Sequence, residues 1–503
     1  MLGTTRVEYV LIKTTILALR SVTPLSFIYV ATWTALRWIP LDAIHIPSHW
    51  ATRLRLPIWT LTWPLLECAF YIAVYLPWSR RLQQAAVHPD LRPRAERERL
   101  FELCHDHIPD INSYTAGWYL GSGSNELRRD NVEDWILWAV FGSSRADMKP
   151  EWKDELESYV RRIEGLVGHD FEPGYNSNVK SIRLTLDDVE TLHRPLLWYM
   201  IVMLVDSITY GYLFSQGFRH YTPAHAAFSV FPVRPLVALL STRSSSPFPY
   251  WIRPHTSSTK KPVLFLHGIG IGLWPYTPFF KEFSSLEPNV GVICVEFLPI
   301  SFRITAPMPN RTTTVAGIHT VLEEHFPIDQ DFVVLSHSYG TVVAAHFLHA
   351  DRARVAAMVM VDPIPLLLHL PSTAHNFVYR RPGMWRANEH QLWYFASRDP
   401  GVAHTLSRRF FWGDNILWKS DLRGVRSAVV LSERDQIIPA SEVWTYLTGS
   451  KVDWADKSIG LAAKWKSPDD EMEVMFYRDV DHSQVFETAA RRAGLLDALR
   501  RVL

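Results

Sequence analysis

The sequence predicts an α/β protein, in which a mostly parallel sheet is flanked by helices and follows a helical, membrane-anchoring N-terminal region. Three observations support this prediction. From residue 262 to the C-terminus, short apolar runs alternate with helical patterns, as in parallel strands covered by helices. Two strongly apolar stretches lie near the N-terminus. The chain has 503 residues, which exceeds one ordinary domain, so we expect at least two structural units.

Composition narrows the class of partner. The net charge is +1 and 20% of the residues are charged, which gives no reason to expect a nucleic acid as partner. The 20 tryptophans and 13% aromatic residues favour apolar pockets or a membrane interface. The three cysteines, Cys68, Cys104 and Cys294, are far apart in the sequence, which indicates packing residues in a reducing compartment rather than a disulfide framework.

Residues 1–84 are predicted to anchor the chain in a membrane through one or two transmembrane helices. The stretch 57–78 carries Glu67 as its only charge and is long enough to cross a bilayer, which takes about 20 apolar residues. The stretch 21–36 carries no charge but is shorter. The alternative is a pair of buried helices in a soluble helical domain.

Arginines predict the orientation of this anchor. Six arginines lie within residues 80–99, after the second stretch, whereas Arg53 and Arg55 are the only basic residues of the loop just before it. Since basic residues favour the cytosolic side, we expect everything after residue 79 to face the cytosol.

The pattern divides the remaining chain into three parts. Residues 85–240 are polar and mainly helical, as in 151–167, where apolar residues recur at helical spacing. The stretch 241–261, rich in serine, proline and aromatic residues, is predicted to be a linker. Residues 262–503 form the α/β domain, with strands expected within 262–268, 290–297, 331–338, 354–364, 426–435 and 471–482.

Ser338 is the first candidate catalytic residue. The segment SHSYG (336–340) follows a predicted strand and precedes a predicted helix, the arrangement of a nucleophile elbow. Such a turn needs small residues two positions before and after the nucleophile. Gly340 meets this condition. At position 336 a serine stands in place of the usual glycine and adds one hydroxymethyl group.

Asp435 and His482 supply the acid and base that a nucleophilic serine needs. Each follows a predicted strand, and the order serine, acid, histidine is the one that this arrangement uses. Since the carboxyl ends of parallel strands lie at one edge of a sheet, we expect the three side chains to meet there. Asp362, at the end of its own strand, is the alternative acid.

A glycine turn supplies the expected oxyanion hole. His267-Gly268-Ile269-Gly270 follows the first predicted strand, and glycines let backbone N–H groups approach a developing alkoxide. We assign the backbone N–H groups of Ile269 and Tyr339 to this role.

Together, HGIG, SHSYG, SERDQIIP and DVDHS resemble the motifs of the α/β-hydrolase superfamily over residues 262–503. With its apolar N-terminus, the whole chain resembles the membrane-anchored α/β-hydrolases of fungal genomes. The resemblance implies a serine hydrolase without cofactor or metal.

Three other motifs point to different functions but match them poorly. In GIGIG (268–272) the third glycine is misplaced for a dinucleotide-binding loop. His105-x4-Asp110 matches an acyltransferase pattern, but in a chain with 21 histidines roughly one such match is expected by chance. Cys104, His105 and His107 lack the spaced partners of a zinc site.

The stretch 365–424 lies where lids of this fold insert. It is rich in large aromatic side chains, which predict an apolar pocket over Ser338. We therefore expect a membrane-attached serine hydrolase that cleaves a hydrophobic, lipid-like carboxylic ester. The alternatives are an acyltransferase with the same triad and a ligand-binding protein without turnover.

A third apolar stretch, 195–218, is interrupted by Asp206. We expect a helix that lies on the membrane or against the catalytic domain rather than a span, packed beside the lid with its aromatic side chains at the mouth of the pocket. The alternative is a third membrane anchor far from the catalytic residues. Asp206 should then face protein, because a carboxylate facing lipid is costly.

Overall fold

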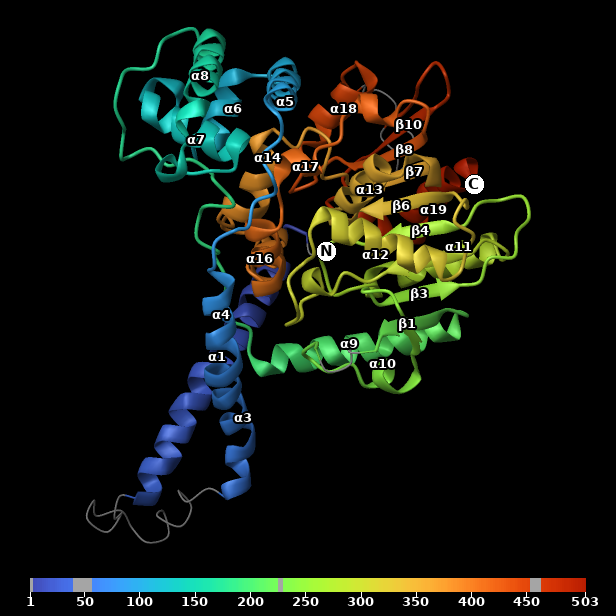
Figure 1. The fold of residues 1–503 in the computed structure, drawn as a ribbon. Helices are drawn as coiled ribbons and strands as arrows, with labels where there is room; N and C mark the ends of the chain where they lie inside the picture. Colours follow the sequence, from blue (N-terminus) through green and yellow to red (C-terminus); the bar gives the residue numbers. More distant parts are fainter. Residues whose placement is uncertain (1–2, 39–56, 225–228, 453–462) are drawn as a thin grey trace.

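The computed structural model of the chain describes residues 3–38, 57–224, 229–452 and 463–503. Figure 1 shows three parts: a sheet with its helices, a helical middle region beside it, and two long helices that project away from this body. Arg53 and Arg55, on which the predicted orientation depends, lie outside the described residues.

A ten-stranded sheet forms the centre of the α/β part. Its strand order is β2-β1-β3-β5-β4-β6-β7-β8-β10-β9, and the six strands from β5 to β10 pair in parallel. All six strands expected from the sequence are present, as β4 (Val263–Leu266), β5 (Val292–Val295), β6 (Phe332–His337), β7 (Val355–Val361), β8 (Arg426–Ser432) and β10 (Met472–Tyr477). The edge strand β9 (Ala463–Lys466) pairs antiparallel with β10.

Alternate residues of these strands enter two separate cores, because successive side chains of a strand point to opposite faces. On one face the strands pack against α11 (Thr277–Leu286) and α19 (Ala489–Val502). On the other face they pack against α12 (Arg311–Glu323), α13 (Tyr339–Ala350) and α18 (Ala440–Thr448). The sheet is therefore covered on both sides, as the alternation of strands and helices predicts.

The stretch 241–261 differs from the prediction of a linker. It contains β2 (Thr242–Ser244) and β3 (Tyr250–Arg253), and β3 pairs antiparallel with β5. The strand β1 (Arg219–Pro223), from the part expected to be helical, lies between them. These strands have three to five residues, too few to show a period of two, and the edge of the sheet supplies their hydrogen bonds.

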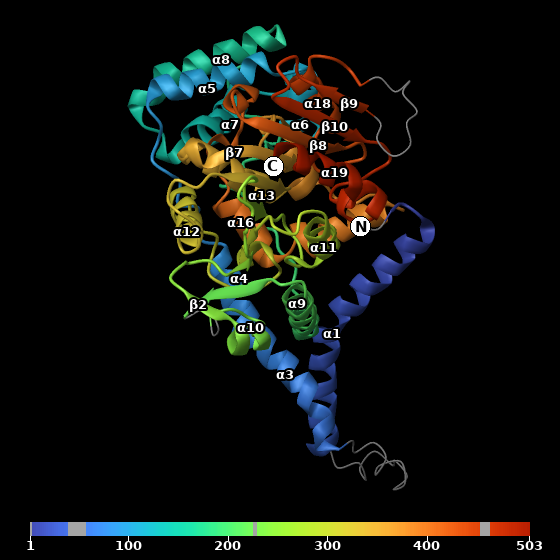
Figure 2. The same cartoon turned by 90° about the vertical axis from the view of Figure 1, so that its right-hand side faces the viewer.

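Within the described residues, three helices are long and apolar enough to cross a membrane: Arg6–Trp38, Ile58–Leu82 and Leu196–Ser215. The first is α1, and the second consists of a short 3-10 turn, α3 (Thr62–Phe70), a π-helical turn and α4 (Leu76–Leu82). α1 and α3 run side by side away from the body as a helical hairpin (Figures 1 and 2). The third is α9, which lies against the body.

The middle region and the lid insertion are helical, and they lie together on the same side of the sheet (Figure 1). The middle region consists mainly of α5 (Arg94–Asp106), α6 (Ile111–Trp118), α7 (Arg129–Phe141) and α8 (Lys153–Val167). Between β7 and β8 the lid forms α14 (Pro371–Ala374), α15 (Ala387–Gln391), α16 (Pro400–Arg408) and α17 (Trp412–Asn415), with π-helical turns at His375–Tyr379 and Leu392–Ser397.

Candidate active site

Ser338 occupies a sharp turn between β6 and α13. Its φ is +51°, in the left-handed region that residues other than glycine rarely adopt. Position 340 must be glycine, because a Cβ there would lie 2.1 Å from the carbonyl oxygen of Leu266. Ser336 fits in place of a glycine, since its buried Oγ donates to the carbonyl oxygen of Val359 at 3.4 Å. The turn therefore has the geometry of a nucleophile elbow.

His482 and Asp435 meet Ser338 at the carboxyl ends of β10 and β8. The His482 Nε2 lies 2.8 Å from the Ser338 Oγ, and its Nδ1 lies 2.7 Å from the Asp435 Oδ2. The other Asp435 oxygen accepts the backbone N–H groups of Ile437 and Ile438, at 2.7 and 3.0 Å. All three predicted side chains are thus in hydrogen-bonding sequence, with the imidazole between serine and carboxylate.

Asp362, the alternative acid, is engaged elsewhere. It is buried at the end of β7, where its Oδ1 accepts the Ser432 hydroxyl at 2.8 Å and its Oδ2 accepts the Ser483 N–H at 2.7 Å. It still lies close enough to act on His482 electrostatically. Each of Asp362, Asp435 and His482 has one side-chain atom that lies within 4.8 Å of such an atom of the other two.

The carboxylates control the charge of His482. Burial alone would lower the pKa of His482, but the charge of Asp435, its hydrogen bond to the ring and the charges of Asp362 and Asp481 raise this pKa to about 9. Burial, followed by the charge of Asp435, raises the pKa of Asp362 to about 7. The imidazole of His482 therefore holds its proton strongly while no substrate is bound at Ser338.

The residues expected to form the oxyanion hole lie beside Ser338. Ile269 and Tyr339 line the same cavity as the serine. Tyr339 is the first residue of α13, so its N–H has no acceptor within the helix. Gly268 brings the preceding loop very close, because a Cβ at this position would lie 2.7 Å from the Ser338 Cβ.

Two residues that support the site were not predicted from the sequence. The Tyr276 hydroxyl accepts the Gly268 N–H at 3.1 Å and lies 2.8 Å from the His337 Nδ1, so it fixes the loop before Ile269. Burial and the charge of His482 hold the pKa of His337 well below its ordinary value. The His337 ring is therefore neutral and can accept the hydrogen bond of the Tyr276 hydroxyl. No spacing in the sequence connects Tyr276 with His337.

Asp481 is the second of these residues. One of its oxygens accepts the backbone N–H groups of Gln436 and His482, at 3.1 and 2.7 Å. Its other oxygen accepts the Asn388 side chain from the lid at 2.8 Å. Asp481 therefore joins the loops that carry Asp435 and His482 to the lid. Its position directly before His482 was the feature of the sequence that could have indicated this role.

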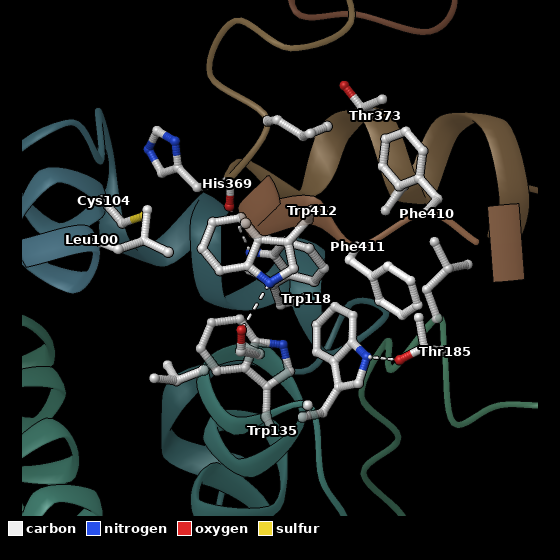
Figure 3. Close-up of a pocket in the computed structure, with 18 of the residues that line it drawn as sticks. Leu100, Cys104, Trp118, Trp135, Thr185, His369, Thr373, Phe410, Phe411 and Trp412 are labelled. Atoms are coloured by element: carbon white, nitrogen blue, oxygen red, sulfur yellow. Dashed lines mark hydrogen bonds between the residues drawn. The ribbon is translucent and has the colours of Figure 1, made fainter. Parts of the chain in front are cut away.

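An apolar cavity of about 220 Å³ adjoins Ser338. The lid supplies Phe377, Phe410, Phe411 and Trp412, and the middle region supplies Leu100, Trp118, Trp135 and Trp138 among others. Figure 3 shows that the side chains of Trp118, Trp135, Phe410, Phe411 and Trp412 converge. The indole N–H groups of Trp412, Trp138 and Trp118 each donate to an oxygen of the wall. An apolar pocket formed by the lid is thus present, and the middle region forms much of it.

The predicted position of the third apolar stretch was wrong in one respect. Trp198 of α9 (Leu196–Ser215) packs against Phe395 of the lid, with ring centroids 5.1 Å apart. None of the residues of α9 lines the cavity, which is lined by the middle region and the lid instead. The expectation that Asp206 faces protein is confirmed, because its carboxylate accepts hydrogen bonds from Arg234 and Arg303.

Known proteins resemble the sheet-containing part of the chain. Residues 263–493 match the model of the alpha/beta hydrolase family. No curated protein matches the chain. Similar solved structures include a carboxylesterase of Nitrososphaera gargenis, at 14% identity and a TM-score of 0.35, with 52% of this chain and 98% of that one covered.

Two further structures are a thermophilic esterase of Thermogutta terrifontis and a putative lipase of Acinetobacter baumannii. The esterase has 14% identity and a TM-score of 0.36, over 52% of this chain and 97% of its own. The lipase has 10% identity and a TM-score of 0.37, over 60% and 96%. Residues 263–493 thus match the model of the alpha/beta hydrolase family, and the chain has the α/β-hydrolase fold that the sequence predicts.

Proposed function

We propose that this protein is a membrane-attached serine hydrolase that cleaves a hydrophobic, lipid-like carboxylic ester. The observation that carries this proposal is the His482 imidazole, which lies 2.8 Å from the Ser338 Oγ and 2.7 Å from the Asp435 carboxylate. The serine opens into a cavity whose wall is mostly apolar. A nucleophile with its base and an apolar binding site are the two requirements for hydrolysis of such an ester.

The reaction follows from the positions of these groups. The Ser338 Oγ attacks the ester carbonyl while His482 takes its proton, and the N–H groups of Ile269 and Tyr339 stabilise the oxyanion. His482 then gives the proton to the departing alcohol, which leaves an acyl group on Ser338. A water molecule, deprotonated by His482, attacks this acyl group; the bond to Ser338 then breaks, the carboxylic acid leaves, and His482 returns the proton to the Ser338 Oγ.

The cavity supports an apolar acyl chain as the substrate group. Each methylene that leaves water gains about 0.8 kcal/mol, and residues of the middle region line much of the cavity. Full-length protein should therefore hydrolyse p-nitrophenyl esters with kcat/KM rising from acetate to medium chains. Addition of a long-chain alcohol distinguishes acyl transfer, because a transferase forms the new ester in place of the free acid.

Narrowing the cavity should change this chain-length preference. Leu100, on α5, points into the cavity (Figure 3), and Leu100→Trp should exclude two to three methylenes. We expect kcat/KM for the longest accepted ester to fall about 15–60-fold, with the acetate ester unchanged.

Leu286→Trp is the matched control for this variant, because Leu286 is exposed at the end of α11 and does not line the cavity. It should leave the whole ester series unchanged. An equal loss for acetate and long esters in Leu100→Trp would contradict the assignment of the cavity to the acyl chain.

The pH dependence of hydrolysis tests the electrostatics of the site. Only a neutral His482 can take a proton from Ser338, so kcat/KM should rise with pH through about 9. Asp362→Asn removes a negative charge near the ring. The pKa of His482 and the acidic limb of the profile should then move down by roughly one pH unit.

Asp469→Asn is the control for the pH measurement, because Asp469 is an exposed carboxylate outside the site. Its profile should match that of the unsubstituted protein. An unmoved acidic limb in Asp362→Asn would show that Asp362 does not act on His482.

Membrane attachment rests on the hairpin of α1 and α3. Its outer faces expose apolar side chains, among them Leu25, Ile28, Leu65 and Leu66, at 48–60% of their surface. Exposed apolar surface of this extent is unfavourable in water and suits a bilayer. The arginines that follow the hairpin favour a cytosolic position for the α/β domain.

A further inference from the structure

The helix α9 has one buried face and one exposed face. One face packs on the body, with Trp198, Tyr199, Val202 and Leu213 buried. The opposite face exposes Leu197, Ile201, Leu204 and Ile208, at 38–59% of their surface. These four residues recur every three to four positions and so form one apolar stripe along the helix. By length and composition α9 can cross a membrane, but one of its two apolar faces is already buried on the body, which leaves only the stripe for contact with lipid.

Buried ion pairs hold the inner face of α9 on the body. Both Asp206 oxygens accept hydrogen bonds from Arg234, each at 3.0 Å, and Arg303 donates to one of them at 2.6 Å. Arg234 also donates to both oxygens of Glu296, at 2.8 and 2.9 Å. Moving α9 into a bilayer would break this buried network and leave its charges without partners, at a cost of several kcal/mol. The helix therefore stays on the body.

The start of α9 is fixed to the hairpin at a particular height. The Leu196 N–H donates to the Glu67 Oε2 at 2.9 Å, and the Thr23 hydroxyl donates to the Glu67 Oε1 at 2.5 Å. On α1, Arg20 is the last charged residue before the uncharged stretch 21–36. The helix α9 thus meets the hairpin at the height where the charged part of α1 ends and its uncharged stretch begins.

The direction of α9 agrees with this level. In Figures 1 and 2, α9 runs across the hairpin rather than along it, and the body lies on the side opposite the hairpin tip. The short helix α10 (Pro235–Leu240) lies beside α9 and extends beyond it toward the hairpin tip (Figure 1). Leu239 and Leu240 of α10 are 78% and 60% exposed. Both helices therefore present apolar side chains away from the body.

We propose that α9 and α10 form a shelf that lies in the plane of the bilayer surface, with the α9 stripe and the exposed leucines of α10 inserted at the boundary between headgroups and acyl chains. The occupant of this apolar face is the lipid bilayer into which the hairpin inserts, so the inference rests on the proposed membrane attachment. Only the hairpin then enters the bilayer deeply, and the shelf sets the height of the α/β domain above it.

The test is the depth of single labelled positions in full-length protein reconstituted in phosphatidylcholine vesicles. Leu204→Cys and Leu239→Cys, each with a fluorescent label, probe the shelf. Ile28→Cys probes the hairpin and Ile328→Cys an exposed loop of the body, at 60% and 76% exposure. The native cysteines are buried, and the unsubstituted protein gives the background of labelling.

Three quenchers distinguish the possible positions: a lipid nitroxide near the headgroup, a lipid nitroxide near the end of the acyl chain, and aqueous iodide. We expect the labels at 204 and 239 to lose most fluorescence with the shallow nitroxide, the label at 28 with the deep nitroxide, and the label at 328 with iodide alone. If the label at 204 lost as much fluorescence with the deep nitroxide as with the shallow one, α9 would enter the bilayer core. If iodide quenched the labels at 204 and 239 while the deep nitroxide quenched the label at 28, the shelf would face water. Either result overturns the shelf and leaves the membrane attachment intact. Iodide quenching at 28 as well would overturn both.

Discussion

Ser338→Ala should lower kcat for ester hydrolysis by on the order of 10⁶-fold, the loss that removal of the nucleophile causes in enzymes with this triad. The Ser338 Oγ is the atom that His482 Nε2 contacts at 2.8 Å, and alanine offers no atom that can form an acyl-enzyme. Burst and steady-state hydrolysis of a medium-chain p-nitrophenyl ester give the measurement.

Folding should be unaffected by this change. Alanine and serine have the same restriction at a φ of +51°, so the strain in the turn is unchanged. Among the described residues, the Ser338 hydroxyl forms a hydrogen bond with His482 alone, so its removal leaves no other group without a partner. The melting temperature should match that of the unsubstituted protein. A variant that folds normally and keeps more than a small fraction of the activity would contradict the role of Ser338.

Asp435→Asn should lower kcat by on the order of 10⁴-fold. The asparagine oxygen can still accept the N–H groups of Ile437 and Ile438, which places the new amide NH₂ toward the His482 Nδ1. The ring then carries its proton on Nε2, which faces Ser338, and cannot take the serine proton. The loss should appear in kcat, with little change in KM for a short ester.

Asp362→Asn is the comparison that separates the two acids. Because Asp362 accepts hydrogen bonds from Ser432 and Ser483 and makes none to His482, its replacement should cost far less activity than Asp435→Asn at a pH above the acidic limb. If Asp362→Asn caused the larger loss, the carboxylate that supports His482 would have been misassigned.

The sequence predicted the parts of the site that local geometry determines. A nucleophile elbow needs a strand, a small residue and a helix in immediate succession, and residues 331–350 contain all three. Asp435 and His482 could be found because each follows a buried strand of six or seven residues, and parallel strands end at one edge. The bulk of the sheet is predictable for the same reason.

Other features depend on contacts between distant segments. The strands β1, β2 and β3 are short and have no period of their own, so only the free edge of β5 accounts for them. The cavity combines the lid with α5, α6 and α7, which lie more than 200 residues away from the lid in the chain. The apolar length of α9 suggested a position at the pocket, whereas the ion pairs of Asp206 hold this helix at the far edge of the sheet.

The central claim is that Ser338 is an activated nucleophile, and covalent labelling with an alkyl fluorophosphonate tests it most directly. The serine oxygen attacks phosphorus, fluoride leaves, and the adduct is stable, so the intact mass of the full-length protein in detergent reports one event. We predict one phosphonyl group per chain, located on the peptide that contains Ser338, and none in Ser338→Ala. Absence of the adduct in the folded protein, or an equal adduct in Ser338→Ala, would contradict the account.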